Sequence, residues 1–308
     1  MSAFAHEPVL VEEVTALLQP AAGKVLLDGT AGGGGHAEAL ARRGARVVAL
    51  DRDPAALRAT AERLRPYRDC AVLRRDFGEA REAVASLGLP AIDGALLDLG
   101  VSSAQLDDPG RGFSFQADGP LDMRMGPEGE TARELLARLS EEEIADILRE
   151  LGEERFCRPI AREIKRAPRM ETTRDLVAAV ERAVPRRAFP AKIHVATRTF
   201  QAVRIAVNHE LSSLDAFLRD APALLRPRGR LAIISFHSLE DRRVKRRFAE
   251  LRGRCTCPPR LPSCACGARA SFRPLTGRAV RPGDPEIASN PRARSARLRA
   301  VEKLEAAA

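Results

Sequence analysis

The stretch Asp28-Gly29-Thr30-Ala31-Gly32-Gly33-Gly34-Gly35-His36-Ala37 decides how this chain folds. It follows the apolar run 25–27, which predicts a buried strand, and it precedes 38–43, which predicts a helix that ends at Gly44. The glycines therefore lie on a turn from a strand into a helix, where missing Cβ atoms let the backbone approach a ligand closely. The first N–H groups of the helix then face whatever binds there.

A carboxylate follows at the spacing of a nucleoside-binding fold. The run 46–50 predicts the next strand, and it ends at Asp51, 19 residues after Gly32. A carboxylate in this position binds the ribose hydroxyls of a cofactor. Because Gly32, Gly34 and Ala37 also satisfy the loose pattern G-x-G-x-x-G/A, these residues alone do not distinguish NAD from S-adenosylmethionine.

Further strands and helices alternate along the chain. A third strand at 71–73 leads to Phe77, a fourth at 92–98 ends in Asp98, and a later one at 230–235 leads to His237. This alternation predicts an α/β fold with a doubly wound parallel sheet, whose ligands bind at the carboxyl ends of the strands. The alternating pattern at 296–301 predicts an antiparallel strand that closes the sheet.

The character of the sequence changes between 106 and 205, where loops and helical periodicity replace the strand pattern. We therefore expect a helical insertion at 106–205, with 1–105 and 206–308 forming the sheet domain. The segment 197–205 is expected to lead from the insertion into a helix that continues through Leu218. Within it, Arg198 and Arg204 are candidate phosphate-binding residues, and the alternative is that both are surface charges.

Charge is unevenly distributed over the 308 residues, which carry a net charge of +9. Residues 226–308 contain 20 Lys and Arg against 7 Asp and Glu, a balance that suits a polyanionic partner such as RNA. The alternative is a coding bias, because 46 of the 51 basic residues are arginine. The sequence contains no apolar run of membrane-spanning length and no signal peptide, so we expect a cytoplasmic protein without membrane contact.

Four cysteines lie close together in the basic quarter of the chain. They form two C-x-C pairs, and they are Cys255, Cys257, Cys264 and Cys266. Disulfides are improbable in a cytoplasmic chain, and four convergent thiolates are typical of structural zinc. The usual spacing in such sites is C-x-x-C, so the alternative is an ordinary loop without metal.

Several longer sequence motifs contain many of the residues named above. They are 28–36, 51–54, 98–103, 105–108, 111–115, 119–125, 196–204, 235–242 and 290–295. In content and order they resemble the bacterial ribosomal RNA small-subunit methyltransferase H family, also called MraW, over nearly the whole chain. The resemblance implies a Rossmann-like class I methyltransferase sheet with a helical substrate-recognition insertion. It also implies methylation, by S-adenosylmethionine, of the exocyclic N4 of cytosine 1402 in 16S rRNA, near the decoding site.

The same resemblance assigns individual residues. The family's cofactor contacts fall on Gly34, Gly35, His36, Asp51, Phe77, Asp98 and Gln105. The Asp/Asn/Ser-Pro-Pro-aromatic signature of many amino-methyltransferases is absent, and 98–103 stands in its place. The proton acceptor therefore stays open between Asp98, Ser102 and His237.

Two other functions remain open on the residues alone. The loose glycine pattern would also suit an NAD-dependent dehydrogenase, and the basic quarter would suit an RNA-binding protein without catalysis. The convergence of three polar clusters on one sheet edge argues against the second alternative. The oligomeric state stays open, a homodimer included.

Overall fold

The computed structural model describes residues 8–191, 193–255, 257, 265 and 267–305. The chain forms two compact units. One unit, Val101–Glu210, is helical. The other contains the chain up to Gly100 and from Leu211 onward, and it holds the sheet.

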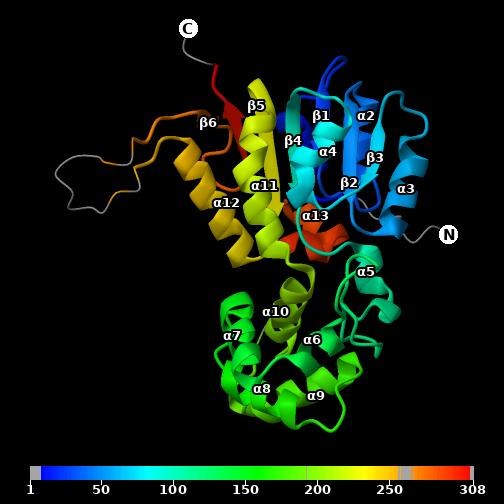
Figure 1. Cartoon of the computed structure of the whole chain (residues 1–308), viewed down its shortest axis with the longest axis vertical. Helices are drawn as coiled ribbons and strands as arrows, with labels where there is room; N and C mark the ends of the chain where they lie inside the picture. Colours follow the sequence, from blue (N-terminus) through cyan, green and yellow to red (C-terminus); the bar gives the residue numbers. More distant parts are fainter. Residues whose placement is uncertain (1–7, 192, 256, 258–264, 266, 306–308) are drawn as a thin grey trace. The chain divides into compact units, whose positions relative to one another are not determined.

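The sheet of the described residues has seven strands in the order β3-β2-β1-β4-β5-β7-β6 (Figure 1). Strands β1 to β5 are parallel, β7 is antiparallel to β5, and β6 is antiparallel to β7. The bounds are β1 Val25–Asp28, β2 Arg46–Asp51, β3 Ala71–Arg74, β4 Ile92–Asp98, β5 Leu225–Ser235, β6 Phe272–Pro274 and β7 Arg297–Lys303. The predicted α/β fold and the antiparallel closing strand are confirmed.

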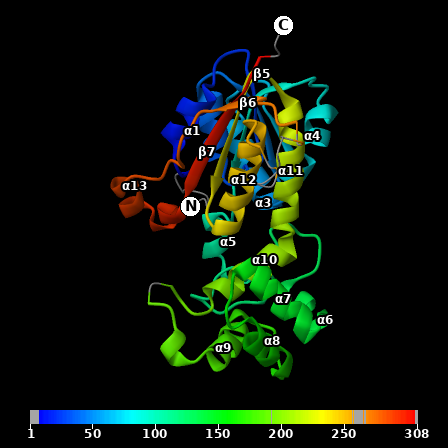
Figure 2. The same ribbon diagram turned by 90° about the vertical axis from the view of Figure 1, so that its left-hand side faces the viewer.

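Helices cover both faces of the sheet (Figure 2). One face packs against α4 (Ala80–Ser86), α11 (Glu210–Leu224) and α12 (Ser238–Leu251). The other packs against α1 (Val11–Leu18), α2 (Gly35–Arg42) and α3 (Pro54–Leu64). The 3₁₀ turn η4 (Pro291–Ser295), which follows α13 (Asp284–Ser289), adds Ala293 to this second core. Side chains of a strand alternate between the faces, so Leu27 joins the first core and Leu26 the second. Both faces are apolar, and the strands are therefore almost continuously hydrophobic.

Strand register places the predicted carboxylates at one edge. Asp28 pairs with Ala49 of β2 and with Leu96 of β4, so the carboxyl ends of these three strands lie together. Asp51 and Asp98 are the last residues of β2 and β4. Ligands of doubly wound folds bind at this edge.

The helical unit has its own core. Its helices are α5 Ser103–Asp107, α6 Ala132–Arg138, α7 Glu141–Gly152, α8 Cys157–Arg166, α9 Thr173–Ala183 and α10 Thr197–Asn208, with 3₁₀ turns η2 Pro109–Arg111 and η3 Arg186–Ala188. Ile144, Leu148, Ile160 and Leu176 are fully buried in it. Ser140 and Glu143 form the capping box at the start of α7, as their spacing predicts.

Three details differ from the sequence-based expectations. The segment 197–205, expected to lead into a helix, is itself helical as part of α10, and the left-handed His209 with φ 53° separates α10 from α11. The strand predicted at 230–235 begins earlier, at Leu225, and its first part is irregular, because the pairing shifts from Ile92–Leu225 to Gly94–Arg230. Strand β6 was not predicted, since three residues carry no usable periodicity.

None of the described helices has the length and apolar composition that crossing a membrane requires.

Candidate active site

The glycine turn between β1 and α2 requires glycine at definite positions. Gly34 has φ 81°, and a Cβ there would lie 2.9 Å from the Cα of Thr60 on α3. Gly32 also has a positive φ of 51°. Helix α2 begins directly after Gly34, and no side chain of the described residues caps its N-terminus. The first N–H groups of α2 are therefore suited to bind an anionic group of a ligand.

Asp51 links this turn to the end of β2. Its Oδ2 accepts a hydrogen bond from the N–H of Gly32 at 2.8 Å, and its Oδ1 accepts one from the N–H of Asp53 at 2.9 Å. Burial raises the pKa of the Asp51 carboxyl, although these backbone hydrogen bonds oppose the shift. The predicted ribose-binding carboxylate is thus fixed in orientation by the turn itself.

Asp28, His36 and Asp98 form a cluster of titratable groups at the same edge. Nε2 of His36 lies 3.5 Å from Oδ2 of Asp98. Oδ1 of Asp28 accepts from the N–H of Thr30 at 3.1 Å, and Oγ1 of Thr30 accepts from the N–H of Asp98 at 2.6 Å. Oδ2 of Asp28 and Oδ1 of Asp98 are buried atoms without a hydrogen-bond partner among the described residues. Buried carboxylate oxygens normally have donors, so these two atoms point to a polar ligand.

The pKa values of Asp28 and His36 are both raised. Burial raises the pKa of Asp28 to about 6, and the nearby His36 only partly offsets the shift. Burial would lower the pKa of His36, but the hydrogen bond and charge of Asp98 outweigh it and the pKa is raised. Such shifted groups at the ligand edge of a sheet are typical of functional sites.

Phe77 lies at the end of β3, in the 3₁₀ turn η1 (Phe77–Glu79). Its half-buried ring packs edge-on against Phe217 of α11, with ring centroids 6.3 Å apart. Its Cβ is 3.1 Å from the position that a Cβ on Gly29 would occupy. The ring therefore stands next to the start of the glycine turn, where an apolar part of a ligand would bind.

His237 has a structural role that its sequence position did not indicate. It is the N-cap of α12, and its Nδ1 accepts from the N–H of Glu240 at 3.5 Å. Its Nε2 lies 3.0 Å from Oε1 of Glu240, whose other oxygen accepts from the N–H of Phe236 at 2.8 Å. Nδ1 of His237 thus caps α12, whereas its buried Nε2 faces Glu240 without a hydrogen bond among the described residues.

Ser102 and Gln105 belong to the helical unit, at the start of α5. The Ser102 hydroxyl accepts from the N–H of Gln105 at 3.2 Å, and the Gln105 side-chain oxygen accepts from the N–H of Ser102 at 3.0 Å. This capping box fixes both side chains to each other. Their roles toward the cofactor and the proton remain predictions.

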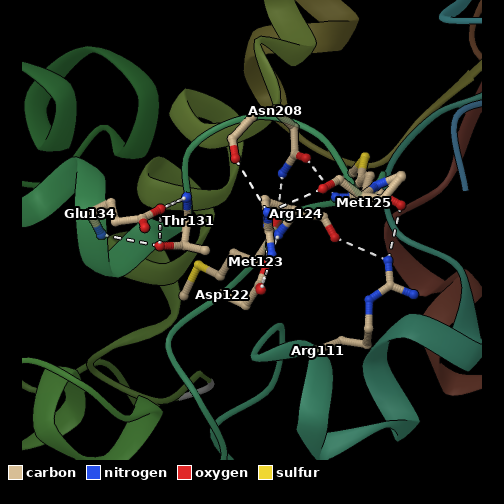
Figure 3. A network of polar contacts seen from close by, with 10 residues as sticks. Arg111, Asp122, Met123, Arg124, Met125, Thr131, Glu134 and Asn208 are labelled. Atoms are coloured by element: carbon tan, nitrogen blue, oxygen red, sulfur yellow. Dashed lines mark hydrogen bonds and ion pairs between the residues drawn. The ribbon is translucent and has the colours of Figure 1, made fainter.

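The string 119–125 of the helical unit is held by a polar network that sequence reasoning missed (Figure 3). Asn208, at the end of α10, donates to the carbonyl of Met123 at 2.7 Å and accepts from the N–H of Met125 at 2.7 Å. Arg111 donates to the carbonyls of Arg124 and Met125 at 3.0 and 2.9 Å. Met123 is fully buried with φ 62°, a strained conformation for a residue with a side chain. Only a long-range contact reveals Asn208, because 83 residues separate it from Met125.

The two candidate RNA-binding arginines differ in their surroundings. Arg198 is exposed, and it donates one hydrogen bond to the carbonyl of Glu153 at 3.2 Å. Arg204 forms a two-bonded ion pair with Glu210 at 2.8 and 2.9 Å, and the exposed fractions of these side chains are 15% and 8%. Arg198 is therefore accessible to solvent, whereas Arg204 forms an ion pair within the helical unit.

The zinc hypothesis is only partly within the described structure. Cys264 and Cys266 lie outside the described residues, whereas Cys255 is exposed and Cys257 half-buried, and neither of these two is in a disulfide bond among the described residues. Among the described residues, no group of three or more His, Cys, Asp or Glu side chains could hold a metal. A zinc site at the four cysteines is thus not supported by the described structure.

Known proteins of one family are similar to this chain over nearly its whole length. The model of the MraW methylase family matches residues 3–304. A protein of Anaeromyxobacter sp. (strain K), named ribosomal RNA small subunit methyltransferase H, is 58% identical over 305 residues and 98% of each chain. Its namesakes from Myxococcus xanthus and Geobacter sulfurreducens are 56% and 50% identical, each covering 98% of this chain and 99% of the relative.

The solved structures that align with this chain have much lower sequence identity to it. An rRNA methylase from Streptococcus thermophilus aligns with a TM-score of 0.45 and 12% identity, over 98% of this chain and 100% of the other. A methyltransferase of Streptococcus mutans, in complex with SAH, aligns with a TM-score of 0.44 and 13% identity, over 97% and 99%.

Proposed function

The chain belongs to the MraW methylase family, and from that membership we propose the reaction that it performs. The protein transfers the methyl group of S-adenosylmethionine to the exocyclic N4 of one cytosine in 16S rRNA of the small ribosomal subunit. The target is cytosine 1402, near the decoding site. The proposal is supported by the sequence resemblance and by the names of the relatives, and it places the enzyme in the cytoplasm with the ribosome.

The residues of the sheet edge fit the groups of S-adenosylmethionine. The cofactor carries a cationic amino group, a cationic sulfonium, a carboxylate and ribose hydroxyls. The buried oxygen of Asp28 that has no partner among the described residues matches its cations and hydroxyls. Asp51 matches the ribose, Phe77 offers an apolar surface to adenine, and the uncapped N-terminus of α2 matches the carboxylate. When bound, the cofactor supplies a methyl group already activated on sulfur.

The chemical difficulty lies on the side of the nucleic acid. Cytosine N4 is a weak nucleophile because its lone pair is delocalised into the ring. The protein must therefore hold N4 in line with the methyl group and accept a hydrogen bond from the amino group. An acceptor at N4 favours a pyramidal nitrogen and takes up the proton as the new bond forms.

Asp98 is the acceptor that the geometry supports best, and this observation carries the proposal. Its Oδ2 faces His36 at 3.5 Å, while its Oδ1 has no partner among the described residues. The side chain as a whole is 21% exposed, and Oδ1 itself is buried. His237 is less suited, because its Nδ1 caps α12 and its Nε2 faces Oε1 of Glu240 at 3.0 Å.

The target base must also leave its helical stack or already be single-stranded, since a paired cytosine cannot reach the sheet edge. The helical unit, with Arg198 on its surface, is proposed to recognise the RNA around that base.

The test is methyl transfer from labelled S-adenosylmethionine to small subunits that lack the modification, followed by nucleoside analysis. We expect N4-methylcytidine at a single position. Transfer to another atom, or to no RNA at all, would refute the proposed reaction.

A further inference from the structure

A cavity of about 440 Å³ lies in the sheet unit, away from the candidate active site. Helix α12 lies beside strands β6 and β7 (Figures 1 and 2), and residues of these three elements are among those that line the cavity. Phe248, Pro274 and Val301 contribute apolar surface. None of the residues that line this cavity belongs to the predicted cofactor set.

The charged lining of the cavity is almost entirely cationic. Six basic side chains and one carboxylate, Glu250, line it. The basic residues are Arg242, Lys245, Arg246, Arg252, Arg254 and Arg299. So many like charges around one hollow repel each other, and a bound anion would relieve that repulsion.

Acidic neighbours neutralise only part of this charge. Arg299 is bound to Asp241 at 2.7 Å, and Arg246 contacts Glu250 at 3.2 Å with 84% of its side chain exposed. Lys245, Arg252 and Arg254 are exposed, and no ion pair to any of them occurs among the described residues. These three cations are available to a ligand.

The lining identifies the chemistry of the ligand. Arginine and lysine around a hollow are the usual donors to phosphate oxygens. The apolar wall and the volume suit one nucleotide unit, with its sugar or base against Phe248 and Pro274 and its phosphates at the rim. A fully solvated surface patch would need neither a hollow nor an apolar wall.

The cavity lies too far from Asp98 for methyl transfer to take place in it. In the sheet, β7 is two strands away from β4, which carries Asp98, and this corresponds to about 10 Å. A nucleotide bound between α12 and β7 is therefore not the cytosine at the cofactor.

We propose that this cavity binds phosphate groups of the rRNA backbone at a nucleotide outside the methylated one. The proposal deepens the proposed function and rests on it, because it assumes that RNA is the substrate. A second contact of this kind fixes the RNA by charge and does not read its sequence.

The test compares two triple variants of the full-length protein. In the first, Lys245, Arg252 and Arg254 are replaced by Ala. In the control, Arg58, Arg65 and Arg68 are replaced by Ala, which removes the same charge from exposed positions on and after α3 at the opposite edge of the sheet. Binding of a 16S rRNA transcript is measured over a salt series, together with thermal stability and S-adenosylmethionine affinity.

We expect the first variant to lose rRNA affinity by about tenfold or more at ~0.1 M salt. Its slope of log affinity against log salt should fall by about 2, since each lost phosphate contact contributes about 0.7. Cofactor affinity and thermal stability should match the wild type, and the control variant should keep the wild-type slope. Equal slopes for the two variants would overturn the proposal.

Calorimetry with AMP and with inorganic phosphate separates RNA from free nucleotides. Tight AMP binding that the first variant loses, with unchanged rRNA binding, would make the cavity a mononucleotide site and overturn the proposal. A wild-type protein that binds the transcript but methylates no small subunit would instead refute the proposed function. The salt slopes would still report on the cavity.

Discussion

Nε2 of His36 lies 3.5 Å from Oδ2 of Asp98, and this contact joins the first turn of α2 to the carboxyl end of β4. His36 is 5% exposed, so its ring cannot move freely. Thr30 fixes the backbone of Asp98 from the other side. Because one carboxylate oxygen is directed at the histidine, the other oxygen is held in a defined direction, as a proton acceptor requires.

Replacing Asp98 by Asn should therefore lower the rate of methyl transfer by at least about 100-fold, because the amide keeps the shape but does not accept the proton. The rate is measured in single turnovers at saturating cofactor. His237→Asn, which keeps a side chain able to cap α12, should cost less than about tenfold. Should the His237 variant be the inactive one, the roles of the two residues would be exchanged.

The buried Asp28 predicts a pH dependence of stability. Burial raises its pKa from 3.8 to about 6, so the folded protein binds this proton more tightly than the unfolded chain. The stabilising contribution is complete below about pH 4 and is lost as the pH rises through about 6. The raised pKa of His36 acts in the same direction above pH 6.5.

The variant Asp28→Asn isolates this effect in the protein without cofactor. Relative to wild type, its free energy of unfolding should improve by up to about 3 kcal/mol between pH 4 and pH 7. Urea unfolding at several pH values gives the difference curve. A flat difference curve would show that Asp28 ionises normally. Cofactor affinity should fall in the same variant, because a carboxylate facing the cationic cofactor is lost.

Sequence reasoning located the sheet edge because its signals are local. A strand of apolar residues that ends in Asp28, Asp51 or Asp98 is visible in a few neighbouring positions, and the fold then brings the three ends together. The function of Asn208 was not visible, since its partners lie 83 and 85 residues earlier in the chain. Nothing local distinguishes a buried Asn that organises a loop from one at the surface.

The surroundings of basic residues also depend on contacts that the local sequence does not reveal. Arg198 and Arg204 look equivalent in the sequence, but Glu210 binds Arg204 two turns further along the chain and leaves Arg198 at the surface. The cavity beside α12 combines residues from 242–255 and 274–301, and its shape depends on how β6 pairs with β7. Composition indicated the excess positive charge of residues 226–308, but it did not indicate the cavity that several of these basic residues line.

Asp51→Ala should weaken S-adenosylmethionine binding by about 1.5–3 kcal/mol, because a charge-assisted bond to the ribose hydroxyls is lost. Part of this loss would come from the glycine turn, since Gly32 and Asp53 lose their acceptor. Isothermal titration calorimetry measures the affinity, and Asp51→Asn should lie between wild type and the alanine variant. An unchanged dissociation constant would remove Asp51 from the site.

Asn208→Ala should destabilise the helical unit by about 2–4 kcal/mol, because it leaves the carbonyl of Met123 and the N–H of Met125 without their partner. Chemical denaturation with a probe in the helical unit measures the effect. Asn208→Asp keeps the acceptor and loses the two donated bonds, so it should also be destabilised. A wild-type stability for both variants would mean that the loop at 119–125 is held by Arg111 alone.

The last prediction separates the two arginines of α10. Arg204→Ala breaks a largely buried ion pair and leaves Glu210 alone, which should cost about 3 kcal/mol of stability. Arg198→Ala removes an exposed charge, so stability should change by less than about 0.5 kcal/mol. If Arg198 contacts phosphate, its loss should still weaken rRNA binding and reduce the salt slope by about 0.7–0.9.

The double variant Arg204→Met with Glu210→Leu supplies the control, since replacing both partners avoids a lone buried charge. It should recover most of the lost stability and bind rRNA as the wild type does. The opposite result, normal salt dependence in Arg198→Ala and weak rRNA binding in the stable double variant, would assign the phosphate contact to Arg204. A phosphate would then bind the N–H groups of Arg204 that lie outside the ion pair, or the pair would open, because Nε and Nη2 both donate to the Glu210 carboxylate.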